Sequence, residues 1–268
     1  MYENYKYLTF ERRGFVLTVI LNNPPANAVN FGVHSELSRV FRDIQHDPHC
    51  NVVVLTGAGR HFSAGGDLHQ MLHNLEDRER MAIEMAEAPE IVHSLLALDR
   101  PTIAQVNGHA IGLGATLALL CDIVFASETA KFADPHVNVG LSAGDGGALI
   151  WPHLIGYTRA RHHLLTGDPL SAAEAVAAGL IYKAVPADQL DEAVQAYAER
   201  LAAKPLQALS ATKKSLNMAL SRQALTEAEA HIGLETLSMI APDHREALLA
   251  LIEKRDPKFT HGRFPVTE

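Results

Sequence analysis

Two glycine-bearing segments, each placed after a run of strand-forming residues, constrain this chain more than any other feature. Residues 61–67 read HFSAGGD and follow the valine-rich run 51–57, while residues 107–116 read NGHAIGLGAT and follow the run 101–106. Glycine lets a backbone turn tightly and approach a ligand closely. The second segment leads into an apolar helix, whose first turn has unpaired N–H groups. Together the two segments can present two N–H groups to one carbonyl oxygen.

The rest of the first part of the chain alternates strand-like and helix-like patterns. Short apolar runs bounded by glycine or proline predict strands, and apolar residues at helical spacing predict helices. The expected strands are residues 16–22, 51–57, 101–106, 121–126 and 130–134, and the expected helices are 31–44, 76–98 and a short one after Gly112. This alternation predicts an α/β layered core.

After Gly156 the pattern becomes mostly helical and rich in alanine. Helices are expected at 160–166, 172–178, 190–203, 205–221 and 227–240, interrupted by a strand-like run at 180–185. No internal repeat or low-complexity linker divides the chain. We therefore predict a catalytic core in residues 1–200 and a helical C-terminal region in residues 201–268.

Composition excludes several classes of protein. With 268 residues, 47% of them hydrophobic, the chain has enough apolar material for a core, and its net charge of −8 argues against nucleic acid as a partner. The two cysteines, Cys50 and Cys121, form no disulfide framework or metal motif. The longest apolar stretch is too short to span a bilayer, and the first residues lack the pattern of a signal peptide. We expect a cytoplasmic protein with no metal and no membrane partner.

The glycine segments predict an oxyanion hole formed by the N–H group of Leu113 and one N–H group from the turn at Ala64-Gly65-Gly66. For either segment alone, close packing between a helix and a strand is the favoured interpretation, because short glycine patterns are weak indicators. Two polar residues downstream favour the functional interpretation. His136 follows Pro135 at a turn, and Asp145 lies between two glycines.

An imidazole takes and returns protons near neutral pH, and a carboxylate can orient it or act as a base itself. His136 and Asp145 are therefore the candidate catalytic residues. Asp145 also precedes a helix-like run, so it is equally well placed as a helix cap. The chain has fifteen histidines, most of which must have other roles.

Many ordered motifs resemble the crotonase, or enoyl-CoA hydratase/isomerase, family along nearly the whole chain. They include residues 22–24 (NNP), 62–67 (FSAGGD), 106–108 (VNG), 112–114 (GLG), 121–123 (CDI), 165–167 (LTG), 178–180 (AGL) and 253–255 (EKR). The resemblance implies a core of ββα units wound in a spiral, a helical C-terminal trimerisation region, and assembly as a homotrimer or dimer of trimers.

The same resemblance implies a CoA thioester substrate and no separate cofactor. Ala64 and Leu113 would hold the thioester oxygen, and Lys254 matches a position that approaches the 3′-phosphate of CoA. The residues expected to contact the substrate or its CoA moiety are Arg60, Gly65, Gly66, Asp67, Leu68, Gly112, Thr116 and Lys254.

The chain also departs from this family at the residues that matter most. Hydratases carry two glutamates, at the positions of Thr116 and His136, and neither is a carboxylate here. The pattern of Pro135-His136, Asp145 and the WPH run at 151–153 resembles the carbon–carbon hydrolase branch typified by oxocamphor hydrolase, and His34 matches a further histidine of that branch. Leu113 stands where that hydrolase has a histidine.

Three functional hypotheses follow. In the first, an acyl-CoA thioester is hydrated or isomerised through an enolate, with His136 and Asp145 in place of the glutamates. In the second, the same residues cleave a carbon–carbon bond in a cyclic β-diketone or a 3-oxoacyl-CoA. In the third, the protein binds acyl-CoA without chemistry, which would account for the loss of both glutamates.

Overall fold

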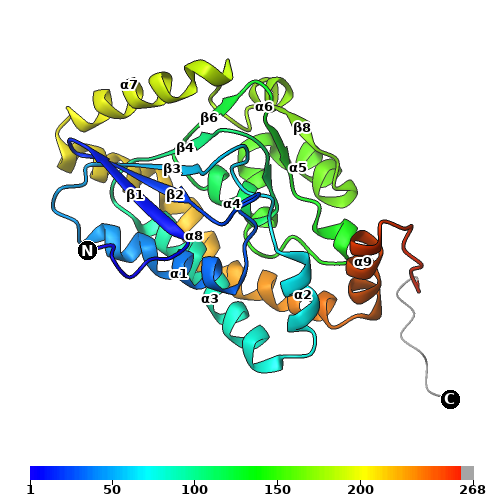
Figure 1. Ribbon diagram of the computed structural model, residues 1–268. Coiled ribbons are helices and arrows are strands. Elements are labelled where there is room, and N and C mark those ends of the chain that lie inside the picture. The colour runs from blue at the N-terminus through cyan, green and yellow to red at the C-terminus, as the bar shows by residue number, and fades with distance from the viewer. Residues whose placement is uncertain (261–268) are drawn as a thin grey trace.

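The computed structural model describes residues 1–260, and its core is a twisted sheet with the strand order β1-β2-β3-β4-β6-β9 (Figure 1). All neighbouring strands are parallel except β1, which pairs antiparallel with β2 at the edge. The strands are β1 (Leu8–Arg13), β2 (Val16–Leu21), β3 (Val52–Gly57), β4 (Thr102–Val106), β6 (Ile123–Ser127) and β9 (Lys183–Val185). Valine-rich runs suit these strands because both faces of the sheet are covered.

A second, smaller sheet has the order β5-β7-β8 and supplies the predicted spiral. Its strands are β5 (Ala110–Ile111), β7 (Lys131–Ala133) and β8 (Leu170–Ser171), and Ser63 joins it through an isolated bridge to Ala110. The chain therefore passes from a strand of the large sheet to a segment beside the small sheet and then into a helix, and it repeats this path after β3, β4 and β6. This confirms the expected α/β fold of ββα units.

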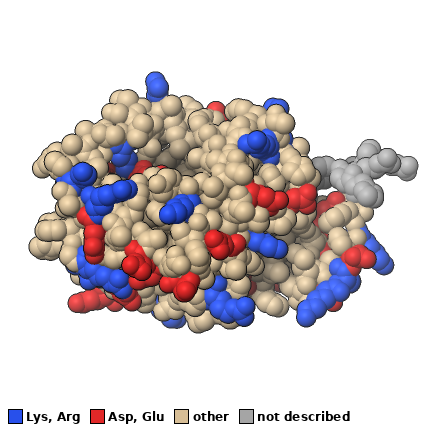
Figure 2. Space-filling model, turned by 90° about the horizontal axis from the view of Figure 1, so that it is seen from above, with Lys and Arg blue, Asp and Glu red and all other residues tan. Residues whose placement is uncertain are grey.

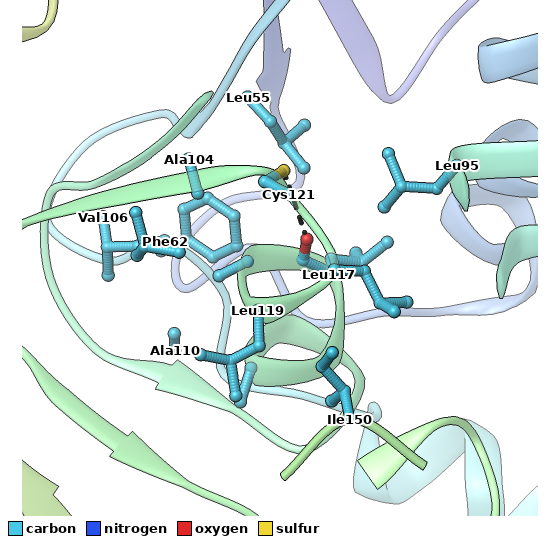
Figure 3. Close-up of a cluster of buried hydrophobic side chains, with 14 of the residues drawn as sticks. Leu55, Phe62, Leu95, Ala104, Val106, Ala110, Leu117, Leu119, Cys121 and Ile150 are labelled. Atoms are coloured by element: carbon cyan, nitrogen blue, oxygen red, sulfur yellow. Dashed lines mark hydrogen bonds between the residues drawn. The ribbon is translucent and has the colours of Figure 1, made fainter. Parts of the chain in front are cut away.

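Apolar residues on the two faces of the large sheet form separate cores. One face, with Val53 and Leu55, packs against α1 (Phe31–Gln45), α3 (Arg78–Ala97) and α4 (Leu113–Leu119). Figure 3 shows part of this cluster around Phe62, where the Cys121 thiol donates to the Leu117 carbonyl oxygen at 3.4 Å. The other face, with Val52 and Val54, packs against α7 (Leu190–Ala202), which lies above the sheet in Figure 1.

The remaining helices are α2 (Leu68–Asn74), α5 (Gly147–Thr166), α6 (Ala172–Ala178), α8 (Leu206–Met239) and α9 (Pro242–Glu253). Two short 3₁₀ helices, η1 (His136–Val139) and η2 (Ala187–Gln189), precede α5 and α7. Helix α8 packs on α3 and α5, and α9 contacts α2 and η1. The turn-forming Gly156 falls inside α5 with φ 74° and kinks it.

The structure corrects three sequence-based expectations. Residues 205–221 and 227–240 form the single helix α8, because the connecting residues contain no glycine or proline to end it. Helix α9 and strand β1 were not expected from the sequence pattern; α9 begins with proline at its first turn, a common start for a helix. The helix expected at 76–98 begins at Arg78 and is preceded by the separate helix α2.

Helix α8 is tied to the sheet by a buried lysine. Lys213 is 6% exposed, and its ammonium lies 2.8 Å from Asp122 and donates to the carbonyl oxygen of Arg100 at 2.9 Å. The division at residue 200 and the trimerisation role of residues 201–268 stay predictions, and residues 261–268 lie outside the described part of the chain.

Acidic and basic side chains are interspersed over the face of the molecule drawn in Figure 2. Among residues 1–260 no helix combines the length and apolar character that crossing a membrane requires.

Candidate active site

A cavity of about 360 Å³ lies where the two glycine segments meet η1, α8 and α9. Its walls are mainly apolar, with a few polar groups, as is usual for small-molecule sites. Among the sequence-predicted site residues, those that line the cavity are His34, Ala64, Gly65, Gly66, Leu68, Gly112, Leu113, His136 and Asp145. The structure thus brings together residues from both glycine segments and the predicted proton-transfer pair.

The hydrogen bonds of the first glycine segment correct the predicted oxyanion donor. The N–H of Ala64 donates to the carbonyl oxygen of Ala26 at 3.0 Å, and that of Gly65 donates to the Ser63 hydroxyl at 3.2 Å. The N–H of Gly66 has no acceptor within residues 1–260. Within the described residues, the free donor of this turn is therefore the N–H of Gly66. The N–H of Ala64 is hydrogen-bonded to the carbonyl oxygen of Ala26.

The second predicted donor is Leu113, whose place in an oxyanion hole stays a prediction. It is the first residue of α4, and its N–H has no acceptor within the described residues. The amino end of a helix carries partial positive charge, so it favours a developing oxyanion. Gly65, with φ +80°, brings the two segments together, since a Cβ atom there would lie 2.8 Å from the carbonyl oxygen of Ile111. Only glycine allows this approach.

His136 lies between two carboxylates. Its Nδ1 atom is hydrogen-bonded to Asp134 Oδ1, and its Nε2 atom lies 3.4 Å from Asp145 Oδ2. The other oxygen of Asp145 accepts from the Thr116 hydroxyl at 3.3 Å, and the carboxylate also accepts from the N–H of Gly147. The structure shows the predicted pairing of His136 with Asp145. The interpretation of Asp145 as a helix cap is wrong, because Gly146 is the N-cap residue of α5 and that cap makes no side-chain hydrogen bond.

Burial opposes a charge on His136, but Asp134 and Asp145 outweigh this and hold its pKa well above the usual 6.5. Burial likewise disfavours ionised Asp145, yet His136 and Thr116 lower the pKa of this carboxyl below its usual 3.8. The pair is therefore an imidazolium beside a carboxylate at neutral pH. Such a pair can give one proton to a substrate and take another.

Asp134 is a site residue that sequence reasoning missed. Its side chain is fully buried, and its Oδ2 atom lies so close to the start of α5 that a Cβ atom on Gly147 would be 1.9 Å away. Gly147 thus makes room for the carboxylate that orients His136. The spacing Asp134-Pro135-His136 was visible in the sequence, but an aspartate at the end of a short strand has no distinctive pattern.

Glu235 of α8 is the second residue that the sequence did not reveal. It lines the cavity and is 6% exposed, and its Oε2 atom is buried with no hydrogen-bond partner among residues 1–260. Burial raises the pKa of Glu235 to about 8, with Asp145 and Asp134 adding to the rise. A buried carboxyl with a raised pKa in a cleft is typical of a functional acid.

Asp134, His136 and Asp145 also lie close enough together for a metal ion to be considered, with their ligand atoms within 4.8 Å of one another. The imidazole, however, separates the two carboxylates, since Nδ1 faces Asp134 and Nε2 faces Asp145. One ion cannot bind both ring nitrogens of the same imidazole. The arrangement suits proton transfer better than metal binding.

Four predicted substrate contacts do not line the cavity. Asp67 caps α2 by accepting from the N–H groups of His69 and Gln70, each at 3.0 Å. The Thr116 hydroxyl donates its hydrogen bond to Asp145. Arg60 and Lys254 are exposed, so their predicted contacts with CoA phosphates stay predictions.

The fold places the chain among α/β enzymes of the ββα spiral class. The chain matches the model of the enoyl-CoA hydratase/isomerase family over residues 11–262 and belongs to that family. A probable enoyl-CoA hydratase of Mycobacterium tuberculosis is 34% identical over 96% of this chain and 99% of the relative. The 1,2-epoxyphenylacetyl-CoA isomerase of Escherichia coli is 34% identical over 91% of this chain and 95% of its own.

Two solved structures are also similar to this chain. An enoyl-CoA hydratase/isomerase from Mycobacterium paratuberculosis superposes with a TM-score of 0.88 and is 36% identical, covering 91% of this chain and 97% of its own. A β-diketone hydrolase from the cyanobacterium Anabaena superposes with a TM-score of 0.83 and is 29% identical, covering 89% of this chain and 96% of its own. Both the expected fold and the expected family are confirmed.

Proposed function

We propose that the protein hydrates or isomerises an unsaturated acyl-CoA thioester through an enolate. This proposal rests on two N–H groups, of Gly66 and Leu113, that have no acceptor within residues 1–260 and lie in the wall of one cavity with an acid–base cluster. A thioester oxygen bound by both donors would be stabilised as negative charge develops on it. Removing one such donor from an oxyanion hole typically costs about 100-fold to 1000-fold in rate.

The proton transfers can then be assigned to the His136–Asp145 pair. During hydration, Asp145 takes a proton from the water that adds to the β-carbon, and His136 Nε2 gives a proton to the α-carbon of the enolate. Asp145 then returns its proton to His136 across the 3.4 Å separation, so both residues regain their starting states. In isomerisation the same pair removes a proton from one carbon and delivers it to another. Glu235, neutral near pH 7, would limit the negative charge around the enolate.

A second candidate is hydrolysis of a carbon–carbon bond in a β-diketone or a 3-oxoacyl-CoA. It is favoured by the imidazole between two carboxylates, which replaces the paired glutamates of the hydratases, and by the likeness to the Anabaena β-diketone hydrolase. Asp145 would take the proton of water as it attacks the ketone carbon. The bond to the α-carbon would break, and His136 would protonate the released enolate.

The conjugated absorbance of trans-2-enoyl-CoA thioesters distinguishes these candidates. Wild-type protein and His136→Ala are compared, with His162→Ala as the control because His162 is exposed and lies outside the cavity. Loss of absorbance with wild type and the control, but not with His136→Ala, supports the hydratase–isomerase proposal.

A parallel assay uses cyclic β-diketones and 3-oxoacyl-CoA thioesters and measures the acids released. Cleavage of these compounds without turnover of enoyl-CoA would replace the first proposal by the second. Tight binding of acyl-CoA with no turnover in either assay would favour a binding protein without chemistry.

A further inference from the structure

A second group of polar side chains lines the same cavity on helices that carry none of the acid–base cluster. Gln70 and Asn74 come from α2, Glu84 from α3 and His34 from α1. In contrast, His136, Asp145 and Glu235 come from η1, the loop before α5, and α8. The cavity therefore has two polar regions, and the proposed chemistry uses only one of them.

Hydrogen bonds fix the side chains of this second region. Gln70 Nε2 donates to Asn74 Oδ1 at 2.7 Å, and Asn74 Nδ2 donates to Glu84 Oε2. Asn74 is 4% exposed, so it is a fixed part of the wall. Asn74 thus binds one carboxylate oxygen of Glu84, and the other oxygen, Oε1, has no hydrogen-bond partner within residues 1–260.

The neighbouring carboxylate, Glu87, is paired differently. Its Oε2 atom is hydrogen-bonded to His34 Nδ1 at 2.9 Å. His34 and Asn74 are thus each hydrogen-bonded to one glutamate. Among the residues of this second region that line the cavity, Glu84 has a carboxylate oxygen with no hydrogen-bond partner within residues 1–260. Burial raises the pKa of the Glu84 carboxyl, which is consistent with a group removed from bulk water.

The rest of the cavity wall is mostly apolar and includes Leu68, Met71, Met85 and Ala88. The charged or titratable groups that act on Glu84 are His34, Glu87 and Arg80. A polar acceptor in such a wall costs free energy unless a donor satisfies it. A purely hydrocarbon acyl group would leave Glu84 Oε1 without a partner. A carboxylate-bearing acyl group would be repelled by Glu84 and Glu87.

We propose that the acyl group of the substrate carries a hydroxyl remote from the thioester, and that this hydroxyl donates a hydrogen bond to Glu84. This inference rests on the proposed acyl-CoA function and adds a substrate class to it. Glu84 is then a specificity-determining residue. Sites that hydrogen-bond a substrate hydroxyl discriminate strongly against the analogue that lacks it, because their own polar groups are left unpaired.

The test compares pairs of trans-2-enoyl-CoA thioesters of equal chain length, with and without a hydroxyl, and moves the hydroxyl stepwise along the chain. For at least one position, wild-type protein should show a kcat/KM about 10-fold or more above that for the unsubstituted partner. Glu84→Leu should abolish this preference, so that kcat/KM becomes similar for the two members of each pair. Glu84→Gln, which keeps an acceptor oxygen and the shape of the side chain, should retain part of the preference.

The matched control is Glu79→Gln, because Glu79 lies on the same helix but is exposed and outside the cavity. It should keep the full preference. Equal kcat/KM within every pair for wild type, or an unchanged preference in Glu84→Leu, would overturn the assignment of Glu84 while leaving the proposed function in place.

Calorimetric binding of the corresponding saturated acyl-CoA pairs gives a readout that needs no turnover. Tighter binding of a hydroxylated compound by wild type, lost in Glu84→Leu, supports the inference even if the chemistry is different. Absence of any acyl-CoA binding would overturn both the proposed function and this inference.

Discussion

His136 Nε2 lies 3.4 Å from Asp145 Oδ2, while the opposite nitrogen of the same imidazole is bonded to Asp134. The ring is thus held from both sides, and its charged form is stabilised by both carboxylates. In the proposed mechanism, His136 gives its proton to the α-carbon of the substrate while Asp145 takes a proton from water. We expect it to control the rate of the chemical step.

Replacing His136 by alanine should lower kcat by about 100-fold to 10,000-fold, the usual contribution of a general acid–base residue. Because the oxyanion donors remain, the apparent affinity for acyl-CoA should change much less. Steady-state kinetics with an enoyl-CoA substrate measure both quantities. Activity close to wild type would show that another group transfers the proton, and His162→Ala should behave as wild type.

Asp134→Asn should lower the pKa of His136, because one of its two stabilising charges is removed. The pKa of His136 in the folded protein lies above its unfolded value near 6.5, so its ion pairs stabilise the fold fully below pH 6.5 and lose this effect as pH rises through the folded pKa. The variant should therefore lose more stability at pH 6 than at high pH. Titration of the His136 ring proton by NMR, with thermal melts at several pH values, checks this. An unchanged pKa would contradict the assigned role of Asp134.

Leu113→Pro should lower kcat by about 100-fold to 1000-fold, because proline removes the N–H that we place in the oxyanion hole. Leu113 is the first residue of α4, and proline is tolerated at that position because the N–H there has no acceptor within the helix. Leu113→Ala is the matched control, since it also removes the side chain but keeps the N–H. Similar rates for the two variants would remove Leu113 from the oxyanion hole.

Glu235→Gln should remove an alkaline limb from the pH profile of kcat/KM. The carboxyl of Glu235 has a pKa of about 8, so in wild type it ionises above that pH and adds a negative charge beside the enolate. Rates measured from pH 6 to 10 should fall above about pH 8 in wild type and stay flatter in the variant. The same fall in both proteins would assign the limb to another group.

The same substitution should affect stability with a defined sign. Because the pKa of Glu235 rises from 4.5 to about 8 on folding, the native state holds a proton that the unfolded state releases, and stability from this group falls as pH rises between those values. Glu235→Gln should therefore raise the melting temperature more at pH 8 than at pH 5. A gain of equal size at both pH values would contradict the raised pKa.

Lys213→Met should destabilise the fold by roughly 2–4 kcal/mol, because it leaves Asp122 without its buried partner. For a chain of this size that corresponds to a melting temperature lower by about 5–15 °C. Lys214→Met is the matched control, since Lys214 is exposed and its nearest carboxylate oxygen, on Asp99, lies 3.7 Å away. Equal melting temperatures for both variants would show that α8 does not depend on this ion pair.

Much of the fold was predictable from local sequence patterns. The strands around Val19, Leu55 and Ile103 follow from short apolar runs, and α1 follows from its apolar spacing. Strand β1 was missed because most of its residues are exposed and its pattern is weak. Helix α8 was divided wrongly because its exposed apolar residues obscure the period that a single amphipathic helix would show.

The sequence by itself determined the α/β class, the two glycine segments and the pairing of His136 with Asp145, since each depends on residues that are close in the chain or on a shared family pattern. Only the tertiary structure decided that Gly66 and not Ala64 has the free N–H, because that depends on the hydrogen bond from Ala64 to Ala26. It also placed Glu235 in the cavity and Asp134 against His136. Burial and orientation set what a carboxyl group can do, and both arise from contacts between segments that are distant in sequence.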